Sequence, residues 1–185
     1  MDTRAPPDTS NTKQPPAEKL AALRAAMKKA GVDGYLVPHG DEHQGESPAP
    51  YAERLKWLPG VSGSAGLAVV FADTAVIFVD GRYTLQVKTQ VDGKLYQYAH
   101  LVDDPPHTWL AKKLSPGMRL GFDPRLHTPA GLKRLEKGVK KAGAELLGVS
   151  HNLIDEIWTD QPARPTAPVS IYPEKFAGRS SAEKR

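Results

Sequence analysis

The 185-residue chain contains no cysteine, which excludes structural disulfides, catalysis by a thiolate and zinc sites built from cysteine. No apolar run approaches the length of a membrane span, and the first residues lack the apolar stretch of a secretory signal. A chain without cysteine also fits a reducing compartment. These absences predict a cytoplasmic protein that does not bind a membrane.

The chain also has little excess charge of either sign, with a formal net charge of +4. Its basic residues are scattered through amphipathic segments rather than clustered with aromatic side chains, so nucleic acid is not an expected partner. Apolar residues make up 39% of the chain, which is enough for a sizeable core but leaves part of the chain as tail.

The clearest pattern lies in two apolar runs rich in β-branched residues, 67–71 and 75–79. A break of three residues separates the two runs, so together they predict a buried β-hairpin. Apolar residues then recur at helical spacing over 83–91, which predicts a helix directly after the hairpin.

The segment between that hairpin and helix is Asp80-Gly81-Arg82-Tyr83. Asp80 is placed to cap the helix by accepting a hydrogen bond from a free backbone N–H. The second strand then presents Arg82 at its end, where α/β proteins often hold groups that face a ligand. The competing interpretation is a surface guanidinium paired with a neighbouring carboxylate.

The remaining patterns alternate between helix and strand, which predicts an α/β domain with a mixed sheet flanked by helices. The predicted helices span 16–30, 50–58, 107–114, 129–143 and 152–158, and the predicted strands span 35–38, 95–100, 119–123 and 144–149.

Composition divides the chain into four segments. Residues 1–15 are polar and proline-rich and are expected to be disordered. Residues 16–160 form the predicted domain, and 161–169 contain three prolines and read as a linker. Residues 170–185 are too short for a domain of their own.

The most polar ordered stretch runs from His39 to Glu46 and contains potential metal ligands at Asp41, Glu42, His43 and Glu46. Side chains two residues apart in an irregular loop need not converge, and metal sites usually draw their ligands from separate elements. A loop that holds no metal is therefore the preferred interpretation, and a zinc or manganese site is the alternative.

A turn of small residues at 59–66 contains three glycines, which invites comparison with a phosphate-binding loop. A phosphate-binding loop follows a strand and opens a helix, whereas this turn precedes a strand. The glycines are better explained by close backbone packing or by positive φ angles.

Taken in order, these motifs resemble the N-terminal part of the long, multi-domain Xaa-Pro aminopeptidases (aminopeptidase P). The resemblance covers residues 19–185 and rests on six motifs: Asp41-x-His43-Gln44-x-Glu46, Arg54, Gly63-Ser64-Ala65-Gly66, Asp80-Gly81-Arg82-Tyr83-x-x-Gln86, Asn152-Leu153-Ile154-Asp155-x-Ile157-Trp158, and Arg164-Pro165. It implies a creatinase/prolidase N-terminal domain with a ribonuclease-H-like fold, and it implies that residues 170–185 are the start of a second domain.

The resemblance also implies what this chain does. Family members release the N-terminal residue ahead of proline, at a dinuclear Mn²⁺ site in a C-terminal domain that has no counterpart here. The resemblance thus implies a domain that covers the substrate cleft, contributes to a homodimer, and holds neither cofactor nor catalytic residues of its own.

Substrate contacts are implied for Arg82, and for Asp41 and His43 in the polar loop. Ser47 stands where the family commonly has tyrosine, and Leu55 stands where a second basic residue often follows Arg54.

Two other functions remain open from the residues alone. One is a free-standing module that binds a peptide or small carboxylate or regulates a partner, without peptidase activity. The other is a small metal-dependent hydrolase that uses Asp41, His43, Glu46 and Asp80. The chain ends after the linker and the opening of another element, which favours a piece of a larger enzyme over a free-standing module.

Overall fold

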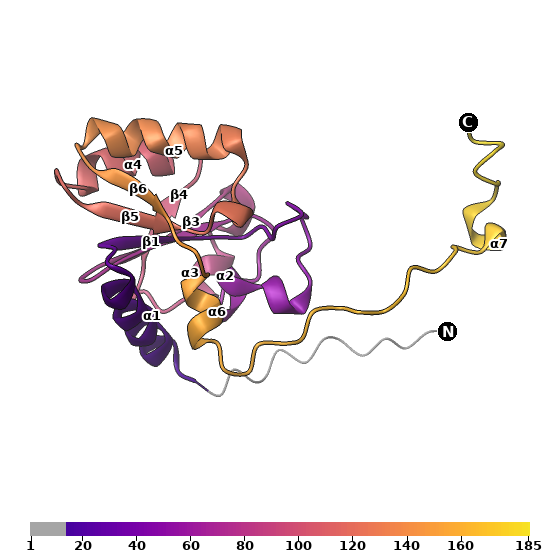
Figure 1. Cartoon of the computed structure of the whole chain (residues 1–185), viewed down its shortest axis with the longest axis horizontal. Helices are drawn as coiled ribbons and strands as arrows, with labels where there is room; N and C mark the ends of the chain where they lie inside the picture. The colour runs from indigo at the N-terminus through magenta and orange to yellow at the C-terminus, as the bar shows by residue number, and fades with distance from the viewer. Residues whose placement is uncertain (1–13) are drawn as a thin grey trace.

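A six-stranded mixed sheet forms the centre of the computed structural model, which describes residues 14–185 (Figure 1). The strand order is β4-β3-β2-β1-β5-β6. The strands are β1 Gly34–Pro38, β2 Leu67–Phe71, β3 Ala75–Val79, β4 Gln97–His100, β5 Arg119–Phe122 and β6 Glu145–Gly148. The predicted disordered tail, 1–15, lies almost wholly outside the described residues.

The predicted hairpin is confirmed and lies in the middle of the sheet. Strands β2 and β3 pair in antiparallel register, with Leu67 opposite Phe78 and Val70 opposite Ala75. Every residue of both strands is buried, because helices cover both faces of the sheet. This explains why the two runs are continuously apolar rather than alternating.

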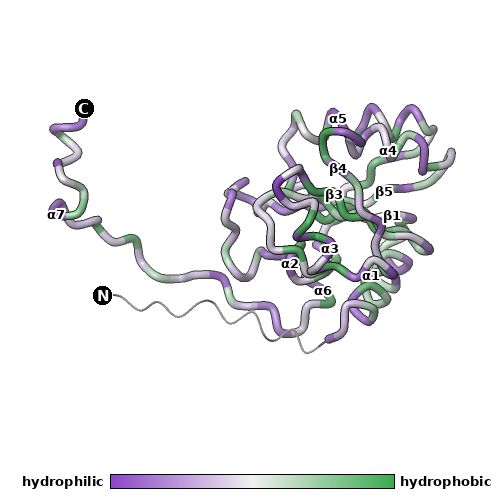
Figure 2. The backbone as a smooth tube through the Cα atoms, turned by 180° about the vertical axis from the view of Figure 1, so that it is seen from behind, coloured by the Kyte–Doolittle hydropathy of each residue, from purple (hydrophilic) through white to green (hydrophobic). Residues whose placement is uncertain are grey.

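Two apolar cores form, one on each face of the sheet. Helix α1 Pro16–Ala30, the short helices α2 Arg54–Trp57 and α3 Gln86–Gln90, and α6 Leu153–Ile157 pack on one face. Helices α4 Pro106–Lys113 and α5 Pro129–Lys141 pack on the other. In Figure 2 the tube is green, and so apolar, along much of the central strands, and purple and green segments alternate along the helices on either side.

Two predicted helices are shorter and more broken than expected. The segment after β3 is a 3₁₀ turn, η2 Gly81–Tyr83, followed by α3. Asp80 does cap it, because the Asp80 side chain accepts a hydrogen bond from the backbone N–H of Arg82, and this bond stabilises a tight turn in place of a full helical turn. Likewise, the predicted helix over 50–58 divides at Glu53 into a 3₁₀ turn, η1 Pro50–Ala52, and α2.

The C-terminal segment leaves the domain after α6 and carries a single helical turn, α7 Glu174–Ala177, away from the sheet (Figure 1). Residues 161–169 contain no regular secondary structure, as their prolines predict. The α7 turn was not predicted. It lies between Pro173 and Gly178, whose φ of 75° ends the helix.

Gly138 of α5 lies where α5 packs closely against the start of α4. A Cβ atom at this position would overlap the backbone carbonyl of His107. We expect Gly138→Ala to force the two helices apart and to lower the free energy of unfolding by about 2 kcal/mol, despite alanine's better helix propensity. Urea denaturation followed by circular dichroism measures this loss. Lys137→Ala, on the exposed side of the same helix, is the control, and equal midpoints for both variants would contradict the close packing.

Candidate functional site

The three predicted site residues lie along one edge of the sheet. Strand β2 runs antiparallel to both β1 and β3, so β1 and β3 are parallel and their carboxyl ends meet at the same edge. Asp41 and His43 follow β1, and Arg82 follows β3. Such an edge is the usual ligand-binding position in α/β sheets.

Asp41 is buried and holds the polar loop in shape. Its Oδ1 accepts hydrogen bonds from the backbone N–H groups of His43, at 3.0 Å, and Gly45, at 3.1 Å. Its backbone carbonyl accepts from the Gln44 side chain at 2.9 Å, and Gln44 has a positive φ of 55°. These contacts leave the His43 side chain exposed at the tip of the loop.

Arg82 is exposed and its guanidinium forms a fork with Asp80. Its Nη2 donates to Asp80 Oδ2 at 2.8 Å, and its Nε lies 3.2 Å from both carboxylate oxygens. The hydrogen bond from Arg82 lowers the pKa of Asp80 and keeps the carboxylate charged. The fork orients an arginine whose side chain is 59% exposed. The paired surface guanidinium expected from the sequence is therefore observed, at a strand end that also suits a ligand contact.

Tyr83 connects this motif to the glycine-rich turn. Its hydroxyl lies 2.8 Å from Ser64 Oγ, and this hydrogen bond lowers the pKa of Tyr83. A Cβ on Gly63 would lie 2.8 Å from the Tyr83 ring, and one on Gly66 would lie 2.8 Å from Leu55 Cδ2. The predicted close packing of these glycines is confirmed, and Gly60 has the positive φ, 96°, that was the other predicted reason.

The polar loop and the glycine-rich turn are also joined. The His39 N–H donates to the Gly66 carbonyl at 3.0 Å, and the His39 ring lies 2.8 Å from the Glu46 carbonyl. Glu46 is close enough to Arg82 for its charge to help raise the Arg82 pKa, after the larger effect of Asp80. The loop at 39–46, the turn at 59–66 and the Arg82 motif thus form one polar surface.

An ion pair between a buried arginine and a half-buried aspartate lies next to this surface and was not predicted from the sequence. Arg54 is 3% exposed, and its Nε and Nη2 donate to the two carboxylate oxygens of Asp155 at 2.7 and 2.8 Å. The resemblance singled out both residues within separate motifs. Their pairing spans 101 positions, and local patterns carry no signal for it.

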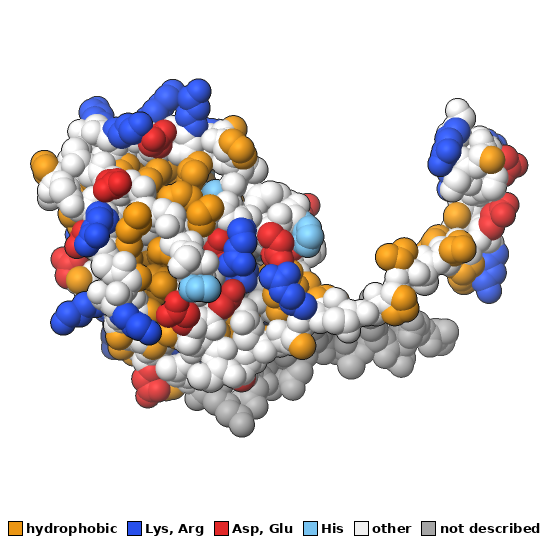
Figure 3. Space-filling model, viewed as in Figure 1, with side chains coloured by type: hydrophobic (Ala, Val, Ile, Leu, Met, Phe, Trp, Pro, Cys, Tyr) orange, Lys and Arg blue, Asp and Glu red, His pale blue; other side chains and the backbone are white. Residues whose placement is uncertain are grey.

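The start of the C-terminal segment joins the same polar network. Gln161 donates to the Tyr51 carbonyl at 2.8 Å and to Asp155 at 2.9 Å. Arg164 donates to Glu42 at 2.6 Å, and Tyr51 donates to the same carboxylate at 2.8 Å. Figure 3 shows basic, acidic and histidine side chains gathered on the face beside the base of this segment.

The described residues do not form a metal centre. Across 14–185, no group of three or more His, Asp or Glu side chains is arranged to hold a metal ion. Oδ1 of Asp41, a residue of the alternative metal site, is occupied by two backbone N–H groups. The polar surface formed by the loop at 39–46, the turn at 59–66 and the Arg82 motif offers hydrogen-bond donors and charges to a ligand. It does not fit a di-nuclear metal group.

No helix within residues 14–185 combines the length and the apolar character needed to cross a bilayer.

Comparison with known families and proteins gives consistent matches. The family model of the creatinase/prolidase N-terminal domain matches residues 19–157. Proteins named probable Xaa-Pro aminopeptidase P are 40% identical over 171 residues in Paracoccidioides brasiliensis and 39% identical over 180 residues in Neosartorya fischeri. These alignments cover 91% and 96% of this chain, which spans only 28% and 27% of the respective relatives.

Solved structures show the same fold. X-prolyl aminopeptidase from Caenorhabditis elegans, described as a cytosolic enzyme with a di-nuclear active site, matches with a TM-score of 0.80 and 31% identity. The match covers 92% of this chain and 30% of that one. The N-terminal domain of the peptidase PepQ from Mycobacterium tuberculosis matches with a TM-score of 0.58 and 25% identity, over 76% of this chain and 98% of that one.

Removing the partner of a buried arginine should destabilise the domain. In Asp155→Ala, Arg54 keeps its charge but loses both of its hydrogen bonds to the carboxylate. We therefore expect the free energy of unfolding to fall by about 2–3 kcal/mol. Thermal unfolding of this variant and of Glu156→Ala, an exposed neighbour on the same helix, tests the expectation. A melting temperature for Asp155→Ala equal to that of the control would show that the ion pair contributes no stability.

The contacts of Glu42 predict a dependence of stability on pH. Partial burial alone raises the pKa of Glu42, but hydrogen bonds from its own backbone N–H, Tyr51 and Arg164 outweigh burial and lower that pKa from 4.5 to about 2. A carboxylate with a lowered pKa stabilises the fold above its unfolded pKa, and this stabilisation is lost as the pH falls through the folded pKa.

The difference in urea midpoint between the wild type and Glu42→Gln should therefore be greatest above pH 4.5 and shrink toward pH 2. A difference that stays constant over this range would contradict the assigned contacts.

Proposed function

The chain belongs to the creatinase/prolidase N-terminal domain family, and we propose that it serves as the N-terminal, substrate-gating domain of a Xaa-Pro aminopeptidase. Relatives that carry this name align with nearly the whole chain at about 40% identity. The observation that carries the gating role is the exposed Arg82, fixed by Asp80 at the carboxyl edge of the sheet.

Arg82 is proposed to bind the peptide substrate. Its fork with Asp80 engages Nε and Nη2, so Nη1 can donate to a peptide carbonyl or carboxylate. A planar guanidinium held in one orientation loses less entropy on binding than a free side chain does. His43 is proposed as a second contact, because its side chain is exposed beside the same edge. Asp41 then acts by holding the His43 loop in place.

Hydrolysis is proposed to depend on a di-nuclear metal centre, with Mn²⁺ as the metal, held by residues outside these 185. The described residues offer no ligand set for such a centre, whereas the Caenorhabditis elegans relative is described as having a di-nuclear active site. This chain would supply substrate contacts and exclude water from the cleft. By the same relationship we propose a cytoplasmic location and a homodimeric full-length enzyme.

The test is Arg82→Ala in the full-length enzyme that contains this domain. We expect kcat/KM for Xaa-Pro peptides to fall about tenfold, the effect of losing one charged hydrogen bond to the substrate. The thermal stability of the variant should remain close to that of the wild type, because Arg82 is exposed. Steady-state kinetics with a Xaa-Pro peptide, in the presence of Mn²⁺, measures the loss.

Arg125→Ala provides a matched control. Arg125 forms the same fork with the aspartate two residues before it, at 2.8 Å, and its side chain is 56% exposed. If both variants reduce kcat/KM equally, or if Arg82→Ala leaves it unchanged, Arg82 is not a substrate contact. Hydrolysis of Xaa-Pro peptides by the 185-residue chain alone would overturn the proposed division of roles.

A further inference from the structure

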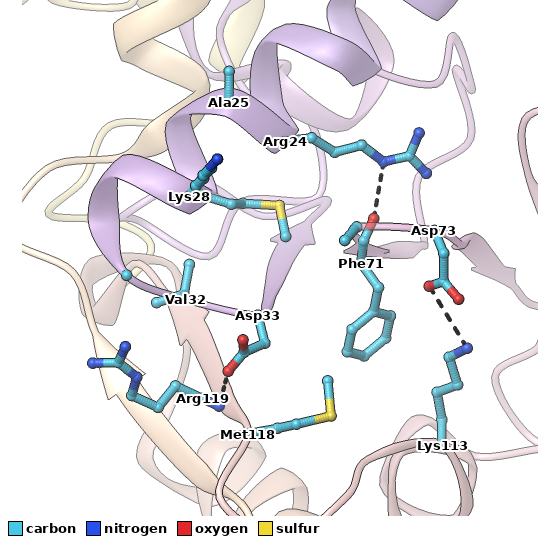
Figure 4. A pocket seen from close by; sticks show the side chains of 13 residues that line it. Arg24, Ala25, Lys28, Val32, Asp33, Phe71, Asp73, Lys113, Met118 and Arg119 are labelled. Atoms are coloured by element: carbon cyan, nitrogen blue, oxygen red, sulfur yellow. Dashed lines mark hydrogen bonds and ion pairs between the residues drawn. The ribbon is translucent and has the colours of Figure 1, made fainter.

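A pocket of about 760 Å³ lies at the opposite edge of the sheet, among residues that the proposed function does not use. It opens beside the start of β5, the end of β2 and the last turns of α1 and α4 (Figure 4). Arg82 and the polar loop follow the carboxyl ends of β1 and β3, so the pocket is separated from them by the length of the strands. Its volume falls in the range of small-molecule sites, about 300–1,000 Å³.

Four basic side chains surround this pocket: Arg24 and Lys28 from α1, Lys113 from α4 and Arg119 from β5. Figure 4 shows them on different sides of the opening. Two acidic residues, Asp33 and Asp73, also line it, so the lining carries more positive than negative charge. Of these four basic residues, Lys113 forms a salt bridge, with Asp73 at 3.9 Å. Arg24, Lys28 and Arg119 form no salt bridge with any described residue.

The ends of the helices do not explain all of this charge. Lys28 and Lys113 lie in the last turns of their helices, where a cation also favours the helix dipole. Arg24 lies further back in α1, and its Nε donates to the Phe71 carbonyl at 2.9 Å, which leaves the rest of its guanidinium for another acceptor. Arg119 begins β5, and its guanidinium lies against Gly31 at the C-terminal end of α1, where the helix dipole also favours a cation.

The floor of the pocket is apolar and adaptable. Met27, Val32 and Phe71 are nearly fully buried beneath it, and Met118 reaches in from the strand side. Thioether side chains adjust to irregular shapes and make favourable contacts with aromatic rings. A ring can therefore pack on this floor while a charged group reaches the basic rim.

We propose that this pocket binds a small aromatic anion, in which a phosphate or carboxylate group is attracted to the basic rim that includes Arg24, Lys28 and Arg119, while an aromatic ring packs against Met27, Phe71 and Met118. The site does not depend on the proposed aminopeptidase role. It places a second ligand on the same domain, on the opposite side of the sheet from the Arg82 motif.

The test is titration of the 185-residue chain with phenyl phosphate, followed by isothermal calorimetry and by NMR. We expect saturable binding at one site. Inorganic phosphate, which lacks the ring, and phenol, which lacks the charge, should each bind about tenfold more weakly. A parallel titration with benzoate distinguishes a phosphate ligand from a carboxylate ligand.

Variants locate the binding site. Arg24→Gln, Lys28→Gln and Arg119→Gln should each weaken phenyl phosphate about three- to tenfold, the range of a partly exposed charged contact. Met118→Gln should weaken phenyl phosphate but leave inorganic phosphate unchanged. Arg134→Gln, an exposed arginine on α5 that does not line the pocket, is the matched control.

Three results would overturn the proposal. The first is a titration that does not saturate by about 10 mM phenyl phosphate, which corresponds to very weak binding. The second is equal affinity for phenyl phosphate and inorganic phosphate. The third is that the pocket variants bind phenyl phosphate as Arg134→Gln does. Circular dichroism of each variant confirms that a loss of binding does not reflect unfolding.

Discussion

The arrangement of the molecule depends on one antiparallel strand. By running back between β1 and β3, strand β2 makes its two neighbours parallel and brings their carboxyl ends to one edge. Without that reversal, the polar loop after β1 and the Arg82 motif after β3 would lie at opposite ends of the sheet. The same reversal places the end of β2, with Phe71, beside the starts of β1 and β5, and so creates the floor of the basic pocket.

The burial of this hairpin also restricts where polar groups can lie. Strands β2 and β3 are apolar throughout because both faces are covered, so ligand-facing groups can occur only beyond the strand ends. Arg54 is a charged side chain buried inside the helical layer. Its charge is tolerated because Asp155 bonds it with two parallel hydrogen bonds, the geometry in which a buried pair best recovers its desolvation cost. The pair also holds α6 and the base of the C-terminal segment against the domain.

The sequence predicted the elements better than the contacts between them. The hairpin and the helices predicted over 16–30 and 129–143 follow from the spacing of apolar residues and from the places of proline and glycine, which are local signals. The division of the helix after β3 could not be predicted, because apolar spacing does not distinguish a 3₁₀ turn from an α-helix. The pairing of Arg54 with Asp155 and the basic pocket both require the packed sheet. Each joins residues from segments far apart in the chain, and their charges look like ordinary surface charges in sequence.

Two turns show how far a local pattern can specify function. Two parallel strands are followed by similar turns, Asp80-Gly81-Arg82 and Asp123-Pro124-Arg125. In each, the aspartate caps a 3₁₀ turn, and the guanidinium of the arginine donates hydrogen bonds to that aspartate. The environments nevertheless differ. The Asp123 side chain is 2% exposed and also accepts a bond from Asn152, whereas the Asp80 side chain is 22% exposed. Asp123 is therefore committed to holding β5 and α6 together, while Asp80 serves to orient an exposed arginine. The same three-residue device stabilises the fold in one place and presents a donor in the other, and the surrounding packing determines which role it has.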